Sequence, residues 1–172
     1  MTEHLSDFPV EQYWRDNRLN MIHEGTHGIQ GMDLLGRKVI MEGGKGLQLL
    51  GLRLHVTIAR ASKIDNLREY AASLGQALQR VAAATQGAWA TPEPSIALAN
   101  ATLYLQGFGH TVLAWIWLEQ AVAAAVGSTD LHRGKLAATQ YFFRFELPKI
   151  DAWLGVVTAR DNTCLNMSAD WF

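Results

Sequence analysis

Residues 95–126, SIALANATLYLQGFGHTVLAWIWLEQAVAAAV, decide the fold class. The segment is apolar on nearly every side of a helix, which is typical of a helix surrounded by other elements. A membrane span needs about twenty uninterrupted apolar residues. Here the run is interrupted by five polar residues: Asn100, Gln106, His110, Glu119 and Gln120. We therefore expect a buried central helix and no membrane span.

Helical periodicity also marks the segments on either side of this helix. From Ser62, a candidate N-cap, apolar residues recur at three- and four-residue steps until about Gly87. Residues 47–58 alternate as a strand would, but they also line one helical face, and no other segment offers a partner strand. A further helix should begin near Leu131, and Pro148 should break or kink it. The pattern predicts an all-α protein whose core is an antiparallel helical bundle.

The amino-terminal segment predicts two helices separated by a tight turn. Pro9 suits the first turn of a helix that runs to about Ile22. Gly25 and Gly28 predict a break, and Thr26 is a plausible N-cap for the second helix. Four apolar residues line one face of that second helix: Ile29, Met32, Leu35 and Val39. We expect a helix-turn-helix ahead of the bundle.

Three glycines, Gly43, Gly44 and Gly46, form the best candidate hinge, because glycine neither propagates a helix well nor packs a core. We place a domain boundary there. Residues 1–42 would then hold the helix-turn-helix, and residues 43–172 would form a four-helix-type domain.

Composition restricts the possible partners. With 49% hydrophobic and 18% charged residues, the 172-residue chain is typical of a globular protein, and its formal net charge of −1 gives no footprint for nucleic acid or an anionic membrane. Cys164 is the only cysteine, which excludes an internal disulfide and fits a reducing compartment. The amino terminus has no basic start followed by an apolar run, so we expect a cytoplasmic protein.

Residues 23–27, His-Glu-Gly-Thr-His, match the zinc-protease pattern H-E-x-x-H. That pattern needs both histidines on one face of an unbroken helix, and two glycines within four residues favour a break. Asp33 occupies the third-ligand position of the extended motif, but the motif's glycine falls one residue late, at Gly31. A zinc hydrolase that uses His23, Glu24 and His27 is therefore a less favoured alternative.

The same residues, taken with their flanks, resemble a different family. Residues 13–39, YWRDNRLNMIHEGTHGIQGMDLLGRKV, are similar to the carboxyl-terminal part of the acyl-CoA dehydrogenases, whose stretch has the form Y-x-R-D-x-R-I/L-x-x-I-Y/H-E-G-T-x-x-I-Q. FGHTVLAWIWLEQA, GKLAATQYFFRFELP and the closing ADWF resemble a helical domain appended in the 3-(methylthio)propionyl-CoA dehydrogenase subgroup. Residues 1–42 would be the last helices of the catalytic domain, and residues 43–172 the appended domain.

The resemblance implies a reaction and a cofactor. Glu24 matches the base that removes the α-proton of an acyl-CoA thioester while the β-hydride passes to FAD. Gly25 would lie against the substrate, and Thr26, His27 and Gly28 against FAD. An electron-transfer acceptor and a homo-oligomer are the further partners that the family implies.

The resemblance also implies that the earlier helices and the flavin-covering β-domain of a complete enzyme precede these residues. We expect the isolated chain to be inactive and to bind no flavin. The alternative function is a helical oligomerisation or docking module with no chemistry of its own. His110, inside an apolar helix, is expected to be structural.

Overall fold

The computed structural model describes residues 10–20 and 26–171. Within them the regular elements are helical, and none is a strand. The α-helices are α1 (Val10–Leu19), α2 (Thr26–Asp33), α3 (Met41–Ala61), α4 (Arg68–Ala88), α5 (Pro94–Leu98), α6 (Ala101–Ala124), α7 (Asp130–Tyr141) and α8 (Ile150–Ala159). The all-α prediction is confirmed. Among the described residues, no helix combines the length and the apolar character that crossing a bilayer requires.

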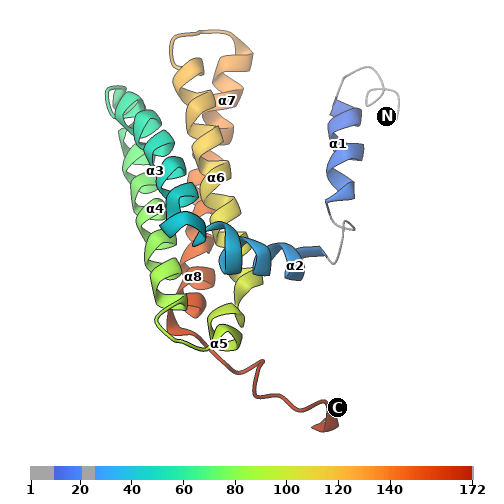
Figure 1. Cartoon of the computed structure of the whole chain (residues 1–172). Coiled ribbons are helices and arrows are strands. Elements are labelled where there is room, and N and C mark those ends of the chain that lie inside the picture. The colour runs from blue at the N-terminus through green and yellow to red at the C-terminus, as the bar shows by residue number, and fades with distance from the viewer. Residues whose placement is uncertain (1–9, 21–25, 172) are drawn as a thin grey trace.

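The bundle is built around α6, which contacts α2, α3, α4, α7 and α8. In Figure 1, α3 and α4 lie side by side as one hairpin, α7 lies beside α6, and α8 lies between α4 and α6 and packs against both. The core between these helices contains Leu54, Leu74, Tyr104, Leu118 and Leu154, all buried. The apolar character of α6 is thus explained by its neighbours, as the sequence predicts.

The helical winding changes between α7 and α8, near Pro148, where a break was predicted. A π-helical turn (Phe142–Glu146) and a 3₁₀ turn (Leu147–Lys149) connect the two helices, and Pro148 lies in the second. The wider turn places Phe142 and Phe143 in the core together. The predicted break at Pro148 is confirmed, although α-helical winding resumes directly after it in α8.

Two predicted helix starts are wrong. Ser62 ends α3, where its hydroxyl donates to the Ile58 carbonyl at 2.7 Å, and α4 begins at Arg68 after a 3₁₀ turn. The long central helix does not begin at Ser95, because the short α5 ends before α6 starts. Asn100 lies between them and donates its side-chain amide to the Asp161 carbonyl at 2.8 Å.

The predicted glycine hinge is a left-handed turn. Glu42, Gly43 and Gly44 have φ values of 51°, 66° and 84°, so the chain reverses its winding before the regular part of α3. Glycine adopts this conformation without steric cost, whereas the Cβ of Glu42 makes it unfavourable there. The division into domains at residue 43 stays a prediction.

A buried hydroxyl pair ties α4 to α6. Thr85 Oγ1 and the Tyr104 hydroxyl are 2.6 Å apart, and Thr85 Oγ1 also lies 2.8 Å from the Val81 carbonyl. Thr85 has one hydroxyl hydrogen, which the carbonyl accepts, so Tyr104 donates to Thr85. Burial raises the pKa of Tyr104 to about 12, with the hydrogen bond to Thr85 opposing the rise.

Candidate functional site

The predicted site residues fall at the start of α2. Glu24 and Gly25 lie outside the described residues, as does His23. Thr26, His27 and Gly28 form the first turn of α2, where the His27 side chain is exposed. A Cβ added at Gly28 would meet no atom within 4 Å, so open space lies beside this turn.

A close approach at Gly31 fixes α2 to the bundle. A Cβ at this position would lie 2.6 Å from the Ala101 carbonyl oxygen and 2.8 Å from its carbon, so the start of α6 leaves no room for a side chain. The sequence motif presents Gly31 only as a misplaced zinc-motif glycine and does not reveal this role. A glycine inside a helix, where no turn requires one, was the available signal for close packing.

The π-helical turn after α2 (Leu34–Lys38) supplies a second anchor. Trp89 at the end of α4 donates its indole N–H to the Leu35 carbonyl at 3.1 Å, and the Leu35 and Val39 side chains are buried. Ile29 and Met32, predicted to share their face, are largely exposed. The apolar face of this segment is therefore covered only at its carboxyl-terminal end.

Asp33, the third-ligand position of the zinc alternative, is engaged elsewhere. Its Oδ1 accepts a hydrogen bond from Arg37 Nε at 2.6 Å, and this bond holds the pKa of Asp33 below its ordinary value. The described residues contain no group of three or more side chains suited to hold a metal ion. His23 and Glu24 are not among them, so the zinc alternative stays untested at those positions.

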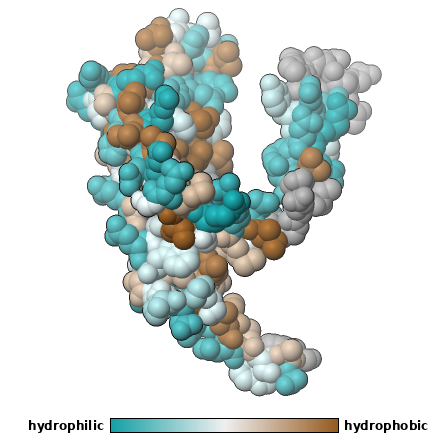
Figure 2. Space-filling view, in the orientation of Figure 1, coloured by the Kyte–Doolittle hydropathy of each residue, from teal (hydrophilic) through white to brown (hydrophobic). Residues whose placement is uncertain are grey.

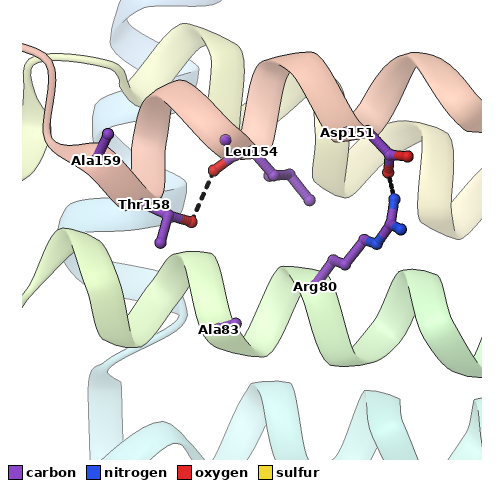
Figure 3. A pocket seen from close by; sticks show the side chains of 7 residues that line it. Arg80, Ala83, Asp151, Leu154, Thr158 and Ala159 are labelled. Atoms are coloured by element: carbon purple, nitrogen blue, oxygen red, sulfur yellow. Dashed lines mark hydrogen bonds and ion pairs between the residues drawn. The ribbon is translucent and has the colours of Figure 1, made fainter.

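A surface groove of about 500 Å³ lies between α4 and α8 (Figure 3). Arg80 and Asp151 form an ion pair across one end of it. Thr158 donates its hydroxyl to the Leu154 carbonyl of its own helix at 2.7 Å. No histidine or cysteine lines the groove, and its polar side chains are bonded to each other or to a backbone carbonyl. We assign this groove no chemistry.

A second groove of about 500 Å³ surrounds the left-handed turn and is lined mainly by apolar residues such as Ile40, Leu47, Leu78 and Trp89. None of its lining side chains titrates. It therefore offers no acid or base for catalysis.

His110 is packed as expected of a structural residue. Its Nδ1 lies 3.1 Å from the Gln106 carbonyl, and its ring meets the Trp153 ring edge-on at 4.8 Å between centroids. Its Nε2 lies 3.8 Å from Glu146, whose pKa is lowered chiefly by a hydrogen bond from Lys149.

Comparison with known proteins extends over most of the chain. Residues 52–168 match the family described as "Acetyl-CoA dehydrogenase C-terminal like". The broad-specificity linear acyl-CoA dehydrogenase FadE5 of Mycobacterium tuberculosis is 25% identical over 180 aligned residues. The 3-methylmercaptopropionyl-CoA dehydrogenase of Ruegeria pomeroyi is 29% identical over 172.

Each alignment covers 95% of this chain and 29% of the relative, so the chain spans less than a third of their length. The family match does not include residues 23–28, and the roles of those residues stay predictions. The match does include the carboxyl-terminal half of α3 and all of α4 to α8. The chain belongs to the acyl-CoA dehydrogenase family and carries its acetyl-CoA dehydrogenase C-terminal-like helical domain.

Proposed function

We propose that this chain is the carboxyl-terminal part of an FAD-dependent acyl-CoA dehydrogenase and is inactive on its own. The observation that carries the proposal is the alignment of 95% of the chain with two acyl-CoA dehydrogenases. The exposed aromatic residues of α1, Tyr13 and Trp14, support it further. They belong to a helix that stands apart from the bundle (Figure 1) and that would gain a partner surface in a complete enzyme.

Glu24 is the proposed base. The thioester carbonyl acidifies the neighbouring α-carbon, and a carboxylate placed there can take the α-proton. Gly25 would allow the substrate to approach the backbone closely. The anchors at Gly31 and Leu35 support this role, because they hold α2 against the bundle and so would limit the movement of the residues before it.

Thr26, His27 and Gly28 would hold the cofactor. The open space at Gly28 and the exposure of His27 fit a group that lies against this turn. The first backbone N–H groups of a helix also lack intrahelical partners and can donate to a bound ligand. FAD, when bound, accepts the hydride from the β-carbon of the substrate. We propose an electron-transfer acceptor and a homo-oligomeric enzyme as the remaining partners.

The experiment is a chimera in which residues 1–172 replace the aligned part of the Mycobacterium tuberculosis relative. We expect the purified chimera to oxidise an acyl-CoA in the presence of an artificial electron acceptor. Glu24→Gln should lower kcat by roughly 10²- to 10⁴-fold, the range that a positioned general base contributes. The matched control is Glu69→Gln, which changes an exposed carboxylate on α4 and should leave kcat unchanged.

An active, flavin-loaded chimera whose kcat is insensitive to Glu24→Gln would remove Glu24 from the mechanism. Turnover of acyl-CoA by the isolated 172-residue chain would contradict the proposal that it is inactive alone.

A further inference from the structure

Helix α3 is apolar on two opposite sides. Leu54 points into the core and is fully buried, while Leu49, Leu52 and Val56 are 55%, 65% and 59% exposed. The exposed three are spaced by three and four residues, so they form one stripe along the helix. A stripe of this kind is what a second helix packs against.

Helix α6, which packs against α3, carries exposed apolar side chains of its own. Leu113 and Ile116 of α6 are 48% and 43% exposed. The two helices are held together by the Trp115 indole N–H, which donates to Thr57 Oγ1 at 2.7 Å. Figure 2 shows hydrophobic side chains gathered over α3 and α6. We call this surface the α3–α6 face; it consists of Leu49, Leu52, Val56, Leu113 and Ile116.

The segment that carries the exposed stripe of α3 has an excess of positive charge. Residues 45–63 contain four lysines and arginines and no carboxylate. Helix α6 contains no lysine, arginine or aspartate, and Glu119 is its one glutamate. Arg60 pairs with Glu119 at 3.1 Å, and Lys45 pairs with Glu42 at 3.0 Å. Arg53 and Lys63 have no carboxylate within 4 Å among the described residues. Arg53 and Lys63 therefore leave this segment with two uncompensated positive charges, in a chain of net charge −1.

This charge distribution decides between the possible occupants. A second copy would bring another uncompensated Arg53 and Lys63 to the interface, and like charges facing each other across an interface oppose association. The five apolar residues include no aromatic side chain, whereas helices that lie in a bilayer interface commonly present Trp or Phe. A narrow apolar stripe bordered by cations is complementary to a helix with an apolar stripe bordered by carboxylates.

We propose that the α3–α6 face docks an acidic amphipathic helix of a partner protein. The partner's apolar stripe covers Leu52 and Val56, and its carboxylates pair with Arg53 and Lys63. This docking does not depend on the role of Glu24.

The test uses the 172-residue chain and a labelled synthetic peptide of about three heptads, with Leu at positions a and d and Glu at e and g. The matched peptide carries Lys at e and g. Fluorescence anisotropy should show the Glu peptide binding at least about tenfold more tightly than the Lys peptide, with the difference shrinking at high salt. Arg53→Glu combined with Lys63→Glu should reverse the preference.

A second pair of variants separates docking from folding. Leu52→Ser with Val56→Ser should abolish binding of the Glu peptide, while Leu131→Ser, at another exposed leucine, should leave it unchanged. Circular dichroism checks that all variants keep the helical fold. Equal binding of both peptides, or binding unaffected by the serine variants, would overturn the proposal. So would binding to phosphatidylglycerol vesicles without peptide binding, or a dimer that Leu52→Ser dissociates.

Discussion

Replacing Gly31 by alanine tests whether the crossing of α2 and α6 depends on the missing side chain. The new methyl carbon would lie 2.6 Å from the Ala101 carbonyl oxygen, about 0.8 Å short of ordinary contact at 3.4 Å. The atoms in the way belong to the backbone at the start of α6, which cannot rotate aside as a side chain does. Helix α2 therefore has to move away from α6.

Two opposing contributions set the size of the effect. Forcing an extra methyl group into a close-packed contact costs about 1 to 3 kcal/mol, and alanine in place of glycine inside a helix recovers up to about 1 kcal/mol. The net loss in the free energy of unfolding is about 1 to 2 kcal/mol. For a chain of this size that corresponds to a melting temperature about 2 to 8 °C lower.

The assay is thermal and urea unfolding followed by circular dichroism, with Gly134→Ala as the matched control. A Cβ at Gly134, inside α7, would meet no atom within 4 Å, so this substitution should stabilise the chain by about 0.5 to 1 kcal/mol. In the active chimera, Gly31→Ala should also lower kcat/KM, by up to roughly 10²-fold if the residues before α2 shift by about 1 Å. If Gly31→Ala stabilised the chain as much as Gly134→Ala, the close contact would be refuted.

Three further outcomes are expected. Stability should fall by about 2 kcal/mol as pH rises from 10 to about 12, because the unfolded state releases the Tyr104 proton first. Tyr104→Phe, compared with the parent by urea titration at each pH, should lack that component. Trp89→Phe removes the donor to the Leu35 carbonyl and should cost about 0.5 to 1.5 kcal/mol in urea unfolding, and an unchanged midpoint would show that this anchor contributes nothing. Elemental analysis of the purified chain should find no stoichiometric zinc, and one zinc per chain that His23→Ala removes would favour the hydrolase alternative.

Much of the fold follows from local periodicity. Residues 47–58 fit both a strand and a helix by pattern, and the lack of a partner strand correctly predicts the helix. The central position of α6 follows from its apolar surface, and the change of winding near Pro148 follows from the missing N–H of proline.

The wrong helix starts involve side chains that can bond to either of two local partners or to a distant one. The Ser62 hydroxyl can cap a following helix or bond back to the preceding turn, and the pattern alone does not distinguish the two. The gap between α5 and α6 carries no proline or glycine; it holds Asn100, which bonds to Asp161 far along the chain.

The candidate site is harder to predict from the periodicity of a single sequence. Glu24 was predicted as the base from its family motif alone, because no periodicity marks a base. The role of Gly31 depends on its contact with Ala101 of α6, which lies 70 positions later in the sequence. A single sequence does not show which helices cross there.

The enclosure of α6 also determines how the molecule opens. Its backbone amides are shielded by five other helices, so no single neighbour can detach and expose the whole of it to solvent. Deuterium should therefore enter the middle of α6 only when the bundle unfolds cooperatively, whereas α1, which stands apart, should exchange almost at once. The slowest amides would then report the global stability of the domain directly.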